Sequence, residues 1–241
     1  MLFRSFAVLA VVSAMAPATT LVALWSPDRL LIAADSNVIT NMPNVLGTAC
    51  KISQDGPIFY AFSGLVEDRT VGYNIEELAH EASQGPGDLS VHLTHFLELA
   101  HDPLVRAVAA VKRDAPEQYA YLEQNHPVLQ AIFADVESGP PTLGVAGVSI
   151  GPDGSLLDYS RIVARGDDGL GPRIIYAGQQ SHIREYLKDH RDWAAGDKAA
   201  LVRNLVQSEI DASKGEVGGP IDIVSIEPHA AHWIQKKNQC K

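Results

Sequence analysis

The sequence has few of the residues that mark several common classes of protein. It contains only two cysteines, which excludes a disulfide-dense scaffold, and it lacks the Cys and His spacing of a zinc site. Basic residues number 19 against 29 acidic ones, so the formal net charge is −10. Binding of nucleic acid requires clustered cations, and this acidic sequence has no basic stripe. We therefore expect no nucleic-acid partner. We also expect no metal and no other cofactor.

Long apolar runs are absent after the first 18 residues, so we expect no membrane contact once that leader is removed. The leader carries one cation, Arg4, then an apolar run from Phe6 to Met15, then the small residues Ala16-Pro17-Ala18. This order is typical of a signal peptide that is cut after Ala18. We therefore predict a signal peptide over 1–18, one domain over 19–241, and export to the periplasm or the medium.

Two other readings of the leader stay open. Residues 1–18 could form a buried strand or helix of a cytosolic protein, or a propeptide that the protein removes itself in the cytoplasm. The cysteines leave a similar choice. Cys50 and Cys240 could pair in an oxidising compartment, but Cys50 could equally be a small buried residue and Cys240 part of a loose, lysine-rich tail.

Thr19 becomes the N-terminus if the leader is cut after Ala18. A threonine at a free N-terminus carries its own base, because its α-amine lies beside its hydroxyl. Asp35 and Lys51 follow Thr19 at two equal intervals. Lys51 would favour the neutral amine and stabilise a developing alkoxide, and Asp35 would supply its counter-charge. Taken singly, Asp35 could simply end a strand and Lys51 could be a solvated lysine.

The apolar pattern predicts two sheets packed together with helices outside them. The expected strands are 20–25, 29–35, 50–54, 58–63, 128–136, 142–150, 156–163, 174–177, 221–226 and 232–236. The expected helices are 68–83, a long one from 89 towards 121 broken near Asp102-Pro103, 181–189 and 198–213.

These residues resemble the opening of a proteasome β-subunit. The resemblance rests on Thr19–Ala23, Leu30–Ser36, Cys50–Ile52 and Phe59–Gly64, with threonine, aspartate and lysine at the family's spacing. It implies an α+β fold, the four-layer αββα sandwich of N-terminal-nucleophile hydrolases. It also implies catalysis by Thr19, Asp35 and Lys51.

Further roles come from the resemblance alone. The oxyanion donor would be a backbone N–H near Ser63 or Gly64. Val38, Ala49, Ser53 and Ala61 would line a pocket for a small or apolar side chain, which nearby Glu67 could alter. The family's supporting serine is replaced by Gly178, and Ser181 is the nearby candidate for its role. Asp211 and Ser213 are the candidates for the aspartate and serine that the family carries just ahead of its final Gly-Gly.

The expected function is therefore hydrolysis of peptide or amide bonds through an acyl-enzyme on Thr19. The alternatives are an amidase or acylase for small amides, and an inactive binding or assembly protein on the same fold. An exported enzyme would have no ATPase partner, because no ATP pool exists outside the cytoplasm. The resemblance leaves open a homo-oligomer or ring.

Overall fold

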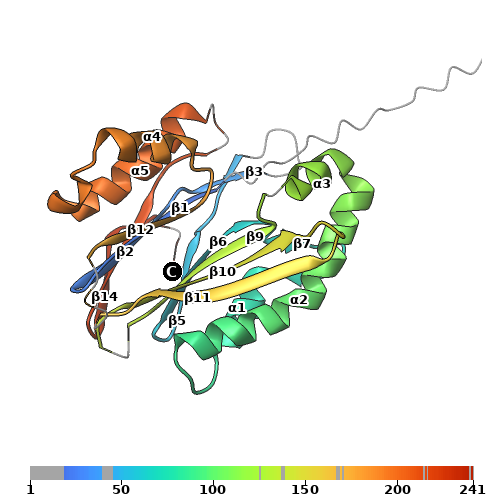
Figure 1. The fold of residues 1–241 in the computed structure, drawn as a ribbon, viewed down its shortest axis with the longest axis horizontal. Coiled ribbons are helices and arrows are strands. Elements are labelled where there is room, and N and C mark those ends of the chain that lie inside the picture. Colours follow the sequence, from blue (N-terminus) through green and yellow to red (C-terminus); the bar gives the residue numbers. More distant parts are fainter. Residues whose placement is uncertain are drawn as a thin grey trace, which may run out of the picture.

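A computed structural model describes residues 19–39, 46–124, 126–136, 139–166, 169, 171–213, 215, 217–238 and 240. The predicted signal peptide therefore lies outside the described residues. The chain has an α+β fold with two five-stranded antiparallel sheets (Figure 1). In the first sheet the strand order is β12 (Arg173–Gly178), β1 (Thr20–Ser26), β2 (Arg29–Ala34), β13 (Asp222–Glu227) and β14 (Ala230–Gln235). In the second sheet it is β11 (Leu156–Ala164), β10 (Thr142–Ile150), β9 (Leu129–Asp135), β6 (Ile58–Gly64) and β5 (Ile52–Asp55).

Helices lie on the outer side of each sheet (Figure 1). One group covers the second sheet and comprises α1 (Ile75–Ser83), α2 (Leu89–Asp114) and α3 (Pro116–Glu123). The other covers the first sheet and comprises α4 (Ser181–Asp189) and α5 (Lys198–Ala212), with a short 3-10 turn at Trp193–Ala195 between them. Two short hairpins complete the described elements, β3 (Asn37–Ile39) with β4 (Leu46–Thr48) and β7 (Glu67–Asp68) with β8 (Tyr73–Asn74). None of the described helices is both long enough and apolar enough to span a bilayer.

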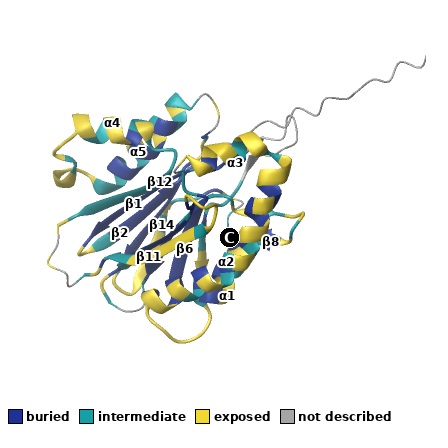
Figure 2. Ribbon diagram, turned by 45° about the vertical axis from the view of Figure 1, so that its right-hand side comes forward, coloured by how far each residue is buried: buried dark blue, intermediate teal, exposed yellow. Residues whose placement is uncertain are grey.

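Three apolar clusters account for this arrangement. One fills the space between the two sheets, and the other two lie between each sheet and its helices. Strand β1 shows the consequence, because all its residues are buried and alternate between two of these clusters (Figure 2). A strand that is covered on both faces reads as a continuous apolar run, which is why the sequence TLVALW was recognisable.

Two of the expected helices differ from the structure. The segment 68–83 begins as the β7–β8 hairpin, and its helix starts only at Ile75, where Asn74 caps it by accepting from the Glu76 N–H. The long helix passes through Pro103 without ending. It ends at Asp114, because Ala115 precedes Pro116, and a residue before proline is forced out of the helical region.

The connections bring the ends of several strands together at one end of the molecule. Strands β1 and β2 form a hairpin, so the start of β1 lies beside the end of β2. Strand β12 ends there as well, because Gly178 pairs with Thr20. In the second sheet β5 pairs with β6, which places the residue before β5 near the end of β6. The candidate site lies where these strand ends meet.

Candidate active site

Thr19, Asp35 and Lys51 come together, although they lie on three different segments. Thr19 immediately precedes β1, Asp35 immediately follows β2, and Lys51 immediately precedes β5. The Lys51 ammonium donates to Thr19 Oγ1 at 3.0 Å and to Asp35 Oδ1 at 2.7 Å. The Lys51 ammonium therefore bridges the Thr19 hydroxyl and the Asp35 carboxylate, as the sequence analysis predicts.

Asp35 is fully buried and its carboxylate is saturated with donors. Oδ1 accepts from the Thr20 N–H at 2.9 Å as well as from Lys51, while Oδ2 accepts from the N–H groups of Asn37, 3.1 Å, and Gly218, 3.3 Å. Burying a carboxylate is unfavourable unless charge and hydrogen bonds compensate. These four donors fix the carboxylate, and the carboxylate in turn fixes the position of the Lys51 ammonium.

The Lys51 side chain is only 9% exposed. Burial lowers the pKa of Lys51 below its ordinary value, because an ammonium loses hydration there. The charge and hydrogen bond of Asp35 oppose this shift, and the positive charge of Lys237 adds to it. The site thus holds a lysine that releases its proton more readily than an exposed lysine does.

Gly178 permits the close approach of β12 to Thr19. Its φ is +79°, and a Cβ built there would lie 1.8 Å from the Thr19 carbonyl oxygen. That carbonyl accepts from the Gln179 N–H at 2.9 Å, and the Gly178 N–H donates to Gln130 Oε1 at 3.1 Å. Gln130 is a neighbour that the sequence analysis missed, because an isolated glutamine in an apolar strand carries no distinguishing pattern.

The predicted oxyanion residues lie at the end of β6. Ser63 is buried, and its Cβ is 3.3 Å from the Cβ position built on Gly178. Gly64 has a φ of +101°, and a side chain there would collide with the Val128 carbonyl. A glycine is therefore required at this bend, and oxyanion binding by either N–H stays a prediction.

The proposed supporting residues are less closely grouped. Ser181 is exposed at the first position of α4, and Gln180 rather than Ser181 occupies the N-cap. The helix start is instead capped by buried Glu209, whose Oε1 accepts from the N–H groups of His182, 2.7 Å, and Ile183, 3.0 Å. Ser181 therefore neither caps α4 nor lies buried beside Thr20 and Gly178.

The other two supporting candidates lie at and beyond the end of α5. Asp211 is exposed and accepts from Gln207 at 2.7 Å on the same helix. Ser213 Oγ accepts from the Val217 N–H at 3.0 Å, which shapes the loop that delivers the Gly218 N–H to Asp35. Ser213 is thus linked to the site through a loop, whereas the bonds of Asp211 are local to α5.

The predicted pocket residues do not share one wall. Ser53 pairs with Tyr60, which packs against α1 and α2, whereas Ala61 pairs with Ile52 and is buried between the sheets. A substrate side chain that reached Ser53 would not contact Ala61, so the expectation that both line one pocket is corrected by the alternation of the strand. Val38 lies on β3, and its side chain is outside what the structure describes.

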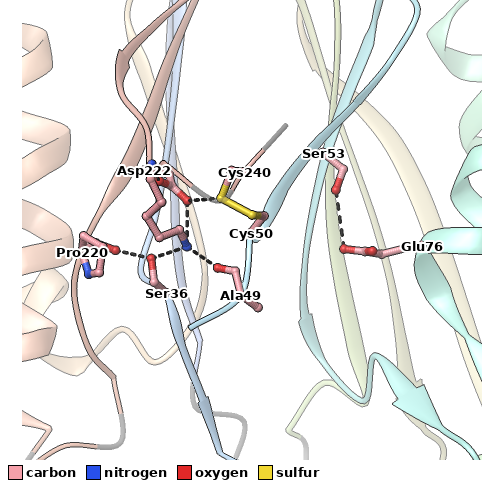
Figure 3. Close-up of a disulfide and its surroundings, with 9 residues drawn as sticks. Ser36, Ala49, Cys50, Ser53, Glu76, Pro220, Asp222 and Cys240 are labelled. Atoms are coloured by element: carbon pink, nitrogen blue, oxygen red, sulfur yellow. Dashed lines mark hydrogen bonds and ion pairs between the residues drawn. A yellow bond between two sulfur atoms is a disulfide. The ribbon is translucent and has the colours of Figure 1, made fainter. Parts of the chain in front are cut away.

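An acidic residue faces Ser53 instead. Ser53 Oγ lies 3.5 Å from Glu76 Oε1, at the start of α1 (Figure 3). Burial raises the pKa of Glu76, and the Ser53 hydrogen bond partly opposes that shift. Glu67, the acidic residue expected to matter, is exposed and paired with Arg69 at 2.6 Å.

Ala49, the remaining pocket candidate, is half-buried beside the C-terminal tail. The cysteines that flank this region are joined, Cys50 to Cys240, with their Cα atoms 5.6 Å apart (Figure 3). Lys237 is buried there, so of the two alternatives for the cysteines the structure has the disulfide and not the loose tail. In the part of the chain that the structure describes, no group of three or more His, Cys, Asp or Glu side chains is arranged to hold a metal ion.

Comparisons with known proteins give little further information. No protein-family model matches the chain, and no curated protein matches it. A solved structure of Anbu from Hyphomicrobium sp. strain MC1 is similar at 18% identity and a TM-score of 0.49, over 90% of this chain and 86% of that chain. A likeness of this low identity and TM-score says nothing about the roles of Thr19, Asp35 and Lys51.

Proposed function

We propose that the protein is an exported N-terminal-nucleophile hydrolase that cleaves peptide or amide bonds with Thr19. One observation carries the proposal, the Lys51 ammonium held between Thr19 Oγ1, 3.0 Å, and Asp35 Oδ1, 2.7 Å. A lysine that served only as a surface charge would be hydrated and exposed. Here it is buried, paired, and directed at a hydroxyl one residue after a predicted cleavage site.

The reaction would begin once the leader is removed. The Thr19 nitrogen is an amide while Ala18 precedes it, and it becomes a base only as a free amine, with a pKa of about 7.7–8.0 in peptides. The amine takes the proton of Oγ1 while Oγ1 attacks the carbonyl carbon of the substrate. The Lys51 ammonium stabilises the developing negative charge on Oγ1 and disfavours a proton on the amine before attack.

Collapse of the tetrahedral intermediate breaks the C–N bond. The leaving amine takes the proton held by the Thr19 ammonium, and the acyl group remains as an ester on Oγ1. The free amine then removes a proton from water, which attacks the ester, releases the acid and restores the hydroxyl. A backbone N–H at Ser63 or Gly64 would bind the oxyanion in both steps.

The fold and the cysteines support the finer parts of the proposal. Three apolar clusters between helices, sheet, sheet and helices fit the αββα sandwich of the proteasome-like hydrolases that the sequence resembles. The Cys50–Cys240 bond fits an oxidising compartment and so favours export over the cytoplasmic alternative. An exported enzyme would act on peptides, small amides or unfolded chains without an ATPase partner, as one chain or as a ring.

The test is to purify the protein from its natural compartment and to determine its N-terminal sequence and intact mass before and after treatment with an epoxyketone. That reagent reacts with both the hydroxyl and the free amine of one residue. We expect a chain that starts at Thr19 and gains one inhibitor mass. Thr19→Ala should not be labelled, and Thr70→Ala, an exposed threonine paired locally with Asp68, should be labelled normally.

Other outcomes separate the alternatives. Labelling with turnover of small amides but not of peptides would replace the peptidase by an amidase or acylase. A chain that begins elsewhere than Thr19, or one that starts there and stays unlabelled and inactive, would overturn the proposal in favour of a binding or assembly protein.

A further inference from the structure

Lys237 is a buried lysine that the proposed reaction does not use. It follows β14, and its ammonium pairs with Asp222 Oδ2 at 2.9 Å, with both side chains no more than 5% exposed. The Lys237 N–H also donates to Asp222 Oδ1 at 2.9 Å. One carboxylate therefore anchors both the backbone and the side chain of this residue.

The same ammonium joins two of the three segments that carry the site, those of Asp35 and Lys51. It donates to Ser36 Oγ at 2.5 Å and to the Ala49 carbonyl oxygen. Ser36 directly follows Asp35, and Ala49 lies two residues before Lys51. Because an ammonium has three N–H donors, Asp222, Ser36 and Ala49 use all of them.

A disulfide bond joins the C-terminal tail that carries Lys237 to Cys50, the residue after Ala49. Cys240 is bonded to Cys50, and Cys50 directly precedes Lys51 (Figure 3). The backbone adds a further link, because the Ala49 N–H donates to the Ser36 carbonyl at 2.9 Å. The residues immediately before Lys51 are thus held by the tail at two consecutive positions.

Simple attachment of the tail does not require a lysine. The disulfide already fixes it, and apolar side chains in place of both Lys237 and Asp222 would fill the space without the cost of burying two charges. The charge has one consequence that an apolar residue could not provide, since it helps to lower the pKa of Lys51. Among the residues that the structure describes, the charges of Asp35 and Lys237 act on Lys51, and in a cut chain the Thr19 amine would join them.

We propose that Lys237 is a positioning residue, which with Cys240 clamps the segment before Lys51 and sets the place and charge of the lysine that acts on Thr19. The part of this inference that concerns turnover rests on the proposed function. The part that concerns Lys51 itself can be measured in an inactive protein.

The first measurement is the titration of Lys51, followed by NMR of isotope-labelled lysine in a Thr19→Ala background. Lys237→Met should raise the pKa of Lys51, because a neighbouring positive charge is lost. Lys236→Met is the matched control, since the adjacent Lys236 lies over the Trp233 ring, 4.5 Å from its centroid, outside this network. The control should leave the titration of Lys51 unchanged.

The second measurement is turnover by the mature enzyme. Lys237→Met should reduce kcat roughly 10- to 100-fold with KM changed by less than about threefold, since small displacements of catalytic groups have effects of this size. The alkaline limb of the pH profile should move to higher pH. Cys50→Ser with Cys240→Ser should reduce kcat while leaving the titration of Lys51 close to that of the parent protein.

The outcomes are distinguishable. If Lys51 titrates as expected but no variant or parent turns over substrate, the proposed function fails and the positioning role stands. If the parent is active while Lys237→Met matches Lys236→Met in titration, kcat and pH profile, the inference is overturned. Should Lys237→Met fail to fold, Lys237→Met with Asp222→Asn removes both buried charges and carries the same test.

Discussion

Asparagine in place of Asp35 removes the counter-charge of Lys51 with almost no change in shape. Each oxygen of the Asp35 carboxylate serves two donors, Thr20 N–H and Lys51 on one side and the N–H groups of Asn37 and Gly218 on the other. Whichever oxygen becomes an amide nitrogen, two buried donors lose their acceptor. At about 1–3 kcal/mol for each, or about 3–5 kcal/mol for a buried charge left unpaired, we expect a loss of about 3–5 kcal/mol.

The loss should depend on pH through Lys51. The pKa of Lys51 is lowered in the fold, so over the interval up to its unfolded value the unfolded chain binds more protons and stability rises with pH. Asp35→Asn removes an influence that raises this pKa, so the interval extends to lower pH. The deficit of the variant should therefore be largest near neutral pH and should shrink as Lys51 becomes neutral in both proteins.

Urea unfolding at neutral and alkaline pH measures both effects. Asp28→Asn is the matched control, because Asp28 is 69% exposed and pairs with Lys198 at 3.4 Å on the surface. Surface pairs contribute about 0–1 kcal/mol, so the control should lose little at any pH. If Asp35→Asn lost no more than Asp28→Asn, and with the same pH dependence, the account of Asp35 as the anchor of Lys51 would be refuted.

Three further substitutions give independent checks. Gly178→Ser restores the serine that the proteasome-like pattern calls for, yet at a φ of +79° its Cβ would displace Thr19, so epoxyketone labelling and the thermal midpoint should both fall rather than rise. Glu76→Gln should reduce any preference for a basic over a neutral substrate side chain. In the parent protein, protonation of Glu76 should remove that preference as the pH is lowered. Because burial raises the pKa of Glu76, the preference should be lost at a higher pH than it would be for an exposed glutamate. The measurement is kcat/KM against pH for two peptides that differ only in a basic or a neutral side chain. Glu209→Ala leaves two N–H groups at the start of α4 uncapped and should cost about 1–3 kcal/mol in urea unfolding, with epoxyketone labelling of Thr19 retained.

The central strands of the two sheets could be predicted from the sequence because they are buried on both faces and are therefore continuous apolar runs. Strands β1 and β10 lie within a residue of their expected bounds, since buried apolar runs are bounded by turn residues. Prediction failed where one local signal competed with the surroundings. Pro103 indicated a break in α2, but the packing of that helix against β9, β10 and β11 outweighs one missing N–H.

Only those residues of the candidate site that follow a recognisable spacing in the sequence could be predicted. Thr19, Asp35 and Lys51 could be named because their residue types and spacing match the proteasome β-subunit pattern that the sequence resembles. Lys237 could not be, because it lies in a lysine-rich tail whose appearance suggests solvent, and only the fold brings it to Asp222. Long-range pairs of this kind leave no periodic trace in a sequence.

The pairing of β1 limits when the predicted leader could be removed by another enzyme. Thr20, the second residue after the predicted cut, is fully buried, paired with Gly178 and bonded through its N–H to Asp35. A separate peptidase binds an extended stretch of chain on both sides of the bond that it cuts, so it cannot engage a strand that already lies inside a sheet. If the protein is exported as proposed and a separate enzyme removes the leader, that cut must therefore come before the first sheet closes. A leader still attached to the folded protein could be removed only by the protein's own residues.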